Sequence, residues 1–259
     1  MEILPDLSIC VIGRRSEEVI TGFLRSLFAA PGYADLQVIV ILADSDLGEK
    51  LGQEFSEALI YEESDLSAPD TVIYNRALQF ATGRYLALVS ENVVCEPAVL
   101  ERLLNFMDDE PDIGLIGPRL LLPSGDVAGS VRLFLSVVSF LLIECSSQDL
   151  PLAKVVRQRH LLADWSRDSS REVQWLSGVF LLFRREVMEE IGLLDEGYVD
   201  QYGDLDYCYR ARRAGWHNHF LHDAEMGLLD AQEQDLRLDS QRILDGLRFL
   251  IKKSRSLWS

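Results

Sequence analysis

Positive charge is scarce in this sequence. It contains 25 Lys and Arg residues against 42 Asp and Glu residues, which gives a net charge of −17 at pH 7. Proteins that bind DNA or RNA broadly need a positive face to neutralise phosphates, so this balance argues against a nucleic-acid partner. A single nucleotide in a locally positive pocket is still compatible with it.

Paired cysteines, a leader segment and long apolar runs are also lacking. The cysteines, Cys10, Cys95, Cys145 and Cys208, show no close pair and no metal-type spacing, which indicates reduced thiols and a cytoplasmic location. The N-terminus lacks the basic start and the apolar run of a signal peptide. The longest apolar run, residues 133–143, is too short to span a bilayer, so we expect a buried helix there rather than a membrane contact.

Several catalytic motifs are absent. The sequence contains neither the G-x-x-x-x-G-K-[ST] loop of P-loop enzymes nor a G-x-G-x-x-G after its first predicted strand. It also lacks the G-x-S-x-G elbow of hydrolases. One histidine cluster is present, His217, His219 and His222, and its first two members would share a face of a strand. That spacing permits a metal site, but a polar edge strand shows the same pattern, and we favour the edge strand.

What is present is an alternation of apolar strands and amphipathic helices. Strands are predicted at residues 7–13, 36–43 and 84–90, and helices at 16–30, 70–83 and 96–111. Such alternation is typical of an α/β fold with a mostly parallel sheet flanked by helices, and we expect the three strands to be neighbours at its centre. Residues 144–172 are polar and are expected to form an irregular loop. Because no repeat or linker interrupts the pattern, residues 1–230 are predicted to form a single domain.

Four stretches of the sequence resemble a known family. They are LSICVIGRRSEEVITGFLRSL (7–27), YNRALQFATGRYLALVSENVVCEPAVLERLL (74–104), PDIGLIGPRLLLPSGDV (111–127) and VQWLSGVFLLFRREVMEEIGLLDEGYVDQYGDLDYCYRARRAGW (173–216). In order and spacing, from Leu7 to about Ala224, the chain resembles the inverting family 2 glycosyltransferases with a GT-A fold, particularly the rhamnosyltransferase-like branch that builds bacterial surface polysaccharides. The resemblance implies a Rossmann-like GT-A sheet. It also implies transfer of a sugar from a nucleotide-diphosphate sugar to a polysaccharide or lipid-linked acceptor.

The resemblance assigns roles to individual residues. Asp204 is in the position of the base that takes the proton of the acceptor hydroxyl, although a carboxylate in the first turn of a helix is also favourable without catalysis. Asp206, two residues on, is expected to support the structure. The positions expected to bind the nucleotide sugar are Gly13, Arg14, Arg15, Asp44, Asn75, Ser90, Asn92, Trp175 and Gly178.

The metal-binding positions of the family are altered in this sequence. Ser90-Glu91-Asn92 replaces the Asp-x-Asp that holds Mg²⁺ or Mn²⁺, and residues 227–229 read Gly-Leu-Leu where a metal-ligating His is expected. A small divalent cation normally keeps carboxylate partners, so we expect no metal cofactor. By alternation along the strand, Glu91 is expected to point away from the pocket.

Positions that handle the nucleotide are altered as well. Leu42 stands where relatives carry a base-reading Asp, with Asp44 following late, and Gly203 replaces a Glu. These changes fit a metal-independent enzyme in which Arg14 and Arg15 neutralise the diphosphate, although a solvated loop is an equal explanation of both arginines. The changes also fit an inactive relative that binds a sugar, a nucleotide or a partner enzyme. We lean to the active transferase.

The C-terminal segment, residues 231–259, is predicted to form an amphipathic helix. Its apolar residues at helical spacing are Leu236, Ile243, Leu244, Leu247, Leu250 and Ile251, and a basic end follows them. We expect this helix to pack on the domain or on another subunit of a homo-oligomer. Peripheral contact with an anionic membrane that holds a lipid-linked acceptor is the alternative, which the acidic body opposes.

Overall fold

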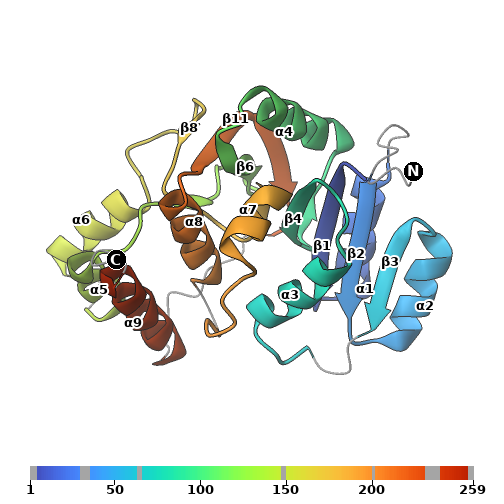
Figure 1. Cartoon of the computed structure of the whole chain (residues 1–259), viewed down its shortest axis with the longest axis horizontal. Coiled ribbons are helices and arrows are strands. Elements are labelled where there is room, and N and C mark those ends of the chain that lie inside the picture. The colour runs from blue at the N-terminus through green and yellow to red at the C-terminus, as the bar shows by residue number, and fades with distance from the viewer. Residues whose placement is uncertain are drawn as a thin grey trace.

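A nine-stranded sheet forms the core of the chain (Figure 1). The computed structural model describes residues 5–29, 36–62, 66–146, 150–199, 202–230 and 240–255. The strands are β1 (Leu7–Gly13), β2 (Leu36–Leu42), β3 (Ala58–Glu62), β4 (Tyr85–Ser90), β5 (Val93–Val94), β6 (Ile113–Leu121), β7 (Val131–Arg132), β8 (Arg171–Glu172), β9 (Trp175–Leu176), β10 (Phe180–Arg184) and β11 (His217–Leu228). The helices are α1 (Glu17–Leu27), α2 (Ser45–Glu54), α3 (Asp70–Phe80), α4 (Pro97–Asp109), α5 (Val137–Glu144), α6 (Pro151–His160), α7 (Arg185–Ile191), α8 (Gly203–Arg213) and α9 (Ser240–Arg255).

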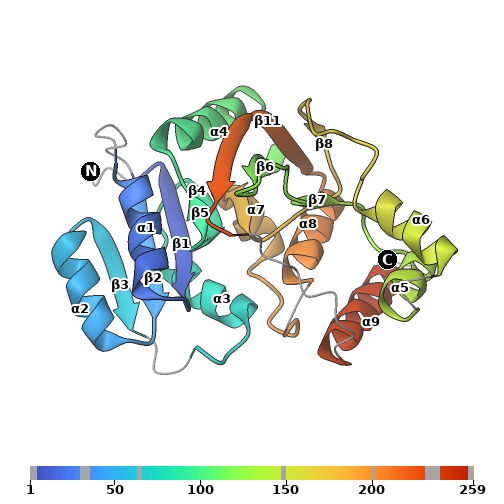
Figure 2. The same cartoon turned by 180° about the vertical axis from the view of Figure 1, so that it is seen from behind.

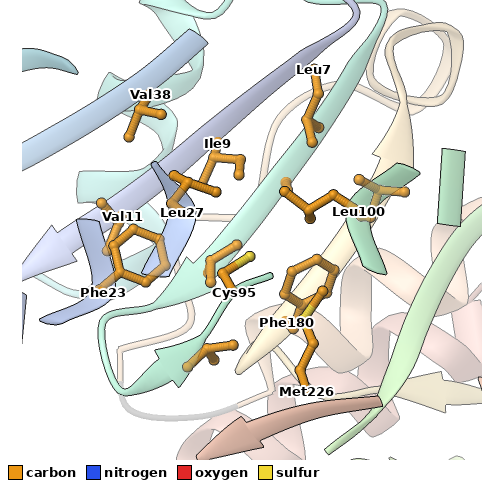
Figure 3. Packing of buried hydrophobic residues seen from close by; sticks show 14 of the residues in the cluster. Leu7, Ile9, Val11, Phe23, Leu27, Val38, Cys95, Leu100, Phe180 and Met226 are labelled. Atoms are coloured by element: carbon orange, nitrogen blue, oxygen red, sulfur yellow. The ribbon is translucent and has the colours of Figure 1, made fainter. Parts of the chain in front are cut away.

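The first half of the sheet confirms the predicted arrangement of strands. β1 pairs in parallel with β2 on one side and with β4 on the other, and β3 pairs in parallel with β2. Successive side chains of a strand point to opposite faces, so Leu7, Ile9 and Val11 join the core cluster with α1 and α4 (Figure 3). Cys10 and Ile12 belong to the cluster on the other face, which includes residues of α3. Full burial of such a side chain stabilises the fold by roughly 1.5–3 kcal/mol. Burial on both faces therefore fixes these strands at the centre of the sheet.

The second half of the sheet is mixed, and it brings distant segments to the end of β4. The strand order is β3-β2-β1-β4-β10-β6-β11-β5, with β8 paired to β11 and a separate two-stranded sheet of β7 and β9. β10 runs antiparallel to β4, with Phe180 opposite Val89. The backbone N–H of Ser90 donates to the carbonyl of Val179 at 2.9 Å. The turn before β10, which contains Gly178, thus lies beside the carboxyl end of β4.

α5 differs from the buried helix expected over residues 133–143. Ser136 caps the helix, because its Oγ accepts a hydrogen bond from the N–H of Ser139 at 3.1 Å, and the helix begins only at Val137. Phe140 is buried, but the apolar residues Val137, Val138 and Leu141 are exposed. A short helix buries one face, so a continuous apolar run leaves some of its residues at the surface.

α6 corrects the expectation of an irregular loop over residues 144–172. Pro151 occupies the first helical position, where its missing N–H has no helical partner to lose. Only Ala153 and His160 of this helix are buried. The helix therefore has a weak apolar periodicity, which is why the sequence pattern hides it.

α9 packs against the domain next to α5, and with α5 and α6 it occupies the end of the molecule opposite β3 (Figures 1 and 2). Phe249 is fully buried. A Cβ atom added to Gly246 would lie 2.2 Å from the ring of Phe140, so the two helices approach closely at this glycine. No helix in the described ranges is both long and apolar enough to cross a membrane.

α9 packs through only part of the predicted apolar stripe. Ile243 and Leu250 pack against the core, whereas Leu244, Leu247 and Ile251 are exposed, and Leu236 lies outside the described residues. Charges also orient α9: Arg242 donates to Glu144 at 2.9 Å and Lys252 lies 2.7 Å from Asp206. A buried carboxylate requires its partner, and this requirement overrides the exposure of a few aliphatic side chains.

Candidate active site

A cavity of about 250 Å³ lies at the carboxyl end of β4. It is bounded by the first turns of α3 and α8, by β7 and by the turn between β9 and β10. Its lining includes Asp70, Thr71, Tyr74, Ser90, Arg132, Trp175, Ser177, Gly178, Tyr198, Tyr202 and Asp204. Ligands of open α/β sheets bind at the carboxyl ends of the strands, so this cavity is the candidate active site.

Asp204 lines the cavity with both carboxylate oxygens fixed by backbone amides. Its Oδ2 accepts from the N–H of Gly178 at 2.7 Å, and its Oδ1 accepts from the N–H of Leu205 at 2.7 Å. The side chain is partly exposed to the cavity and is otherwise enclosed by protein. Burial raises the pKa of Asp204, and the amide of Gly178 and the positive charge of Arg132 oppose that rise. A raised pKa makes the ionised carboxylate a stronger base.

The backbone before Asp204 adopts an unusual conformation that aims the first turn of α8. Tyr202 has a φ of 71°, in the left-handed region that residues with a side chain rarely adopt. Its hydroxyl donates to Glu144 at 2.7 Å, which holds it in place. At Gly203, a Cβ atom would lie 2.5 Å from the methyl group of Thr71. A larger residue therefore cannot precede Asp204 without displacing Thr71.

Glu91 points toward the tip of β1, and it is not among the residues that line the main cavity. Its Oε1 accepts from the N–H groups of Arg14 at 3.0 Å and Arg15 at 2.7 Å. Burial raises the pKa of Glu91, and the two amides oppose that rise.

The guanidinium groups of Arg14 and Arg15 lie at this tip, each with a carboxylate partner. Arg14 pairs with Asp70 and donates to the carbonyl of Ala68 at 2.8 Å. Arg15 pairs with Asp230. The two side chains remain 38% and 33% exposed. Arg14 lines a second hollow that shares Asp70 with the main cavity, so the tip of β1 adjoins the candidate active site.

A family model described as "Glycosyltransferase like family 2" matches residues 5–242. The chain belongs to this family. The match confirms the family predicted from the sequence motifs, and it covers the sheet, the cavity and the tip of β1.

Solved structures confirm the GT-A fold of this glycosyltransferase-like chain. GalNAc-T7, solved with UDP, GalNAc and Mn²⁺, superposes with a TM-score of 0.69 at 11% identity, covering 97% of this chain and 48% of that one. The mannosyltransferase PcManGT from Pyrobaculum calidifontis, solved with GDP-Man and Mn²⁺, gives a TM-score of 0.61 at 13% identity, covering 98% of this chain and 65% of that one. At such low identity these likenesses establish the fold and nothing finer.

Two curated relatives are similar in sequence. The N-acetylglucosaminyl-diphospho-decaprenol L-rhamnosyltransferase of Mycobacterium tuberculosis is 28% identical over 145 residues, which cover 55% of this chain and 46% of the relative. The protein y4gI of Sinorhizobium fredii is 24% identical over 242 residues, which cover 87% of this chain and 24% of the relative. The chain thus spans less than half the length of either relative.

The structure separates the predicted sugar-nucleotide residues of this family member into three groups. Ser90, Trp175 and Gly178 line the cavity with Asp204. Gly13, Arg14, Arg15 and Asn92 gather at the neighbouring tip of β1 and β4. Asp44 and Asn75 do neither: Asp44 caps α2 by accepting from Leu47, and Asn75 donates to the carbonyl of Leu194 and accepts from its N–H. Both of these side chains have structural partners in place of a ligand.

The side chains at the position that the resemblance assigns to a metal ion are mostly engaged with other protein groups. Asn92 donates its Nδ2 to Asp230 at 2.7 Å, and the other oxygen of Asp230 pairs with Arg15. Mg²⁺ and Mn²⁺ require several oxygen ligands. Here the carboxylate of Asp230 already carries a guanidinium, and backbone amides hold Oε1 of Glu91. Oε2 of Glu91 and Oδ1 of Asn92 are buried and accept no hydrogen bond within the described residues, which leaves only two oxygens of the protein free at this position.

The histidine cluster has structural partners as well. Within the described ranges, no three His, Cys, Asp or Glu side chains are grouped so that they could hold a metal ion. His217 lies 3.2 Å from Glu172, and the ring of His219 packs on Phe106. β11, which carries the cluster, pairs with β6 on one side and with β8 on the other, so the edge-strand interpretation is wrong.

Arg132 is one of the cavity residues that the sequence analysis did not predict. It lies on β7 opposite Trp175 and is only 8% exposed. The signal in the sequence is a charged residue inside the apolar stretch SVRLFL. A charge predicted to be buried needs a partner or a ligand, so this pattern marks Arg132 as a candidate site residue.

Proposed function

We propose that this chain transfers a sugar from a nucleotide-diphosphate sugar to a hydroxyl group of a saccharide acceptor, with Asp204 as the general base. The observation that carries the proposal is the fixed Asp204 carboxylate in a cavity at the carboxyl end of β4. The M. tuberculosis relative is named for a rhamnosyl donor group and an N-acetylglucosaminyl-diphospho-decaprenol acceptor. By analogy, we propose a diphosphate-linked saccharide as the acceptor of this chain.

The proposed reaction moves one proton and one glycosyl group. The acceptor hydroxyl gives its proton to Asp204 as its oxygen forms a bond to the anomeric carbon of the donor. The bond between that carbon and the diphosphate oxygen breaks on the opposite face, and the nucleoside diphosphate leaves with the electron pair. Fixed hydrogen bonds orient Asp204 before the reaction, so no reorganisation of the base is needed in the transition state.

The charge that accumulates on the leaving diphosphate needs a positive partner. In this proposal Arg15 and Arg14 supply it, because both guanidinium groups are partly exposed at the tip of β1. Guanidinium groups bind phosphate oxygens in a bidentate geometry. Asp230 holds the Arg15 guanidinium beside Asn92, the position of the family's metal motif, so Arg15 takes the role of the cation.

Calorimetric titration with rhamnosyl, mannosyl and N-acetylgalactosaminyl nucleotide-diphosphate donors tests the proposal. The expected result is tight binding of one donor and release of nucleoside diphosphate when a short-chain N-acetylglucosaminyl diphosphate prenol is added. Binding of a nucleotide sugar without release would favour the inactive binding protein instead. Absence of any binding across the panel would refute the donor class.

As the pH is lowered, the transfer rate is expected to begin to fall at a higher pH than it would if the base were an Asp with an ordinary pKa. Asp204 acts as a base only when ionised, and burial raises its pKa. The rate is therefore full above the raised pKa and falls about tenfold per pH unit below it. Measurement of kcat between roughly pH 4 and pH 8 checks this against the ordinary Asp value of about 3.9. Glu91 also has a raised pKa, but it acts at the tip, so its protonation should alter donor affinity rather than kcat.

A chelator is expected to leave the transfer rate unchanged. The variant Asn92→Asp alone should not create dependence on Mn²⁺, because Arg15 would still occupy Asp230.

The variant Arg15→Gln should weaken binding of the nucleoside diphosphate roughly tenfold or more, as expected for loss of a charged hydrogen bond. Arg25→Gln is the matched control, because it removes an exposed arginine of α1 that pairs with Glu54 of α2. Activity that a chelator abolishes and Mn²⁺ restores would refute this assignment.

A further inference from the structure

Arg132 is a buried cation for which the described structure provides no counter-ion. Its side chain is almost fully enclosed, its Nε has no hydrogen-bond partner, and no carboxylate of the described residues forms an ion pair with it. Glu144, a nearby carboxylate, is bound by Arg242 and Tyr202. Asp204 attracts Arg132 but uses its oxygens on two backbone amides. An unpaired buried charge is unfavourable, so its retention at a cavity wall needs another explanation.

A second unsatisfied donor lies beside it. The indole N–H of Trp175 is buried and makes no hydrogen bond of normal geometry, although it is near enough to help lower the pKa of Asp204. The guanidinium carbon of Arg132 lies 4.8 Å from the centre of the Trp175 ring, and both residues line the cavity. A guanidinium and an N–H group facing one space are donors suited to an oxyanion.

We propose that Arg132 and Trp175 bind a phosphoryl oxygen of the acceptor, so that this chain selects a phosphate- or diphosphate-linked saccharide. The assignment to the acceptor follows from position and rests on the proposed function. The base lies beside the attacking hydroxyl, and the leaving diphosphate departs from the opposite face. Arg132 interacts with Asp204, whereas the exposed arginines that suit the leaving group lie at the tip of β1. A phosphoryl group bound by Arg132 therefore belongs to the acceptor side.

The test compares the equilibrium binding of three probes by wild type and by Arg132→Gln. The probes are a short-chain N-acetylglucosaminyl diphosphate prenol, the neutral methyl N-acetylglucosaminide, and UDP. The variant is expected to bind the diphosphate prenol about 10- to 100-fold more weakly, as for loss of a charged hydrogen bond, and to bind the other two probes unchanged. Arg132→Lys should recover part of the affinity because it keeps the charge. Arg119→Gln, in which a partly exposed arginine loses its pairing with Glu225, is the matched control and should bind all probes as wild type does.

Each other outcome has a definite meaning. Equal affinity of wild type and Arg132→Gln for the diphosphate prenol would overturn the proposal, and so would a selective loss of UDP binding, which would place Arg132 on the donor side. A melting temperature well below that of wild type would show that Arg132 is structural, since removing an unpaired buried charge should not destabilise the fold. The assay needs no turnover, so a wild-type chain that fails to consume any nucleotide sugar would refute the proposed function without deciding the role of Arg132.

Discussion

The substitution Asp204→Asn is expected to reduce the rate of sugar transfer by about 10²- to 10⁴-fold, the usual contribution of a positioned general base. The amide is nearly the same size as the carboxylate but cannot accept the proton of the acceptor hydroxyl. The loss should appear in kcat, because the nucleotide-sugar donor binds mainly through the tip of β1 in the proposed reaction. Release of nucleoside diphosphate from the preferred donor, with acceptor in excess, measures it.

Two controls separate a catalytic role of Asp204 from a structural one. Donor affinity measured by calorimetry should be unchanged in Asp204→Asn. Asp44→Asn is the matched variant, because Asp44 caps α2 and does not line the cavity, and it should transfer at the wild-type rate. If Asp204→Asn retained more than about a tenth of the wild-type kcat, Asp204 would not be the base, and its amide contacts would be those of a helix N-terminal acid.

The sheet could be predicted from the sequence because its central strands are buried on both faces. In β1 every second residue from Leu7 faces one core cluster and the residues between face the other, so the segment reads as a continuous apolar run. α6 gives no such signal, since it is a polar surface helix with few buried positions. The rotation of α9 was also beyond the sequence, because it depends on a carboxylate contributed by α5.

The part of the site that could be predicted from the sequence is the part in which recognisable motifs hydrogen-bond to each other. Gly178 and Asp204 belong to motifs near each other in the chain, and the structure joins them by one hydrogen bond. Asn75 was assigned to the ligand from its motif, yet its partner Leu194 lies 119 residues away. A contact between segments so far apart cannot be read from local spacing.

Asp206 provides the second large expected effect, on stability rather than on rate. It is fully buried, and its carboxylate accepts from Arg210 at 2.7 Å and from the hydroxyl of Tyr198 at 3.3 Å and pairs with Lys252 at 2.7 Å. Asp206→Ala leaves two cations without this partner, and removing one member of a buried ion pair costs about 3–5 kcal/mol. Urea unfolding should show this loss in the free energy of unfolding, and the melting temperature should fall by on the order of 10 °C.

A double-mutant cycle with Lys252 tests how much of the loss arises from its contact with Asp206, since Lys252 also pairs with Asp195 at 3.0 Å. Lys252→Met alone should destabilise less than Asp206→Ala, because Arg210 still pairs with Asp206. The double variant should be more stable than the sum of the two single losses predicts, since the contact between Asp206 and Lys252 can be lost only once. Additive losses would show that the two residues act independently. An unchanged unfolding midpoint for Asp206→Ala would show that Asp206 does not anchor α9. Under either result the pairing of Lys252 with Asp206 would no longer fix the rotation of the helix, so the exposure of Leu244 and Leu247 would need a different cause.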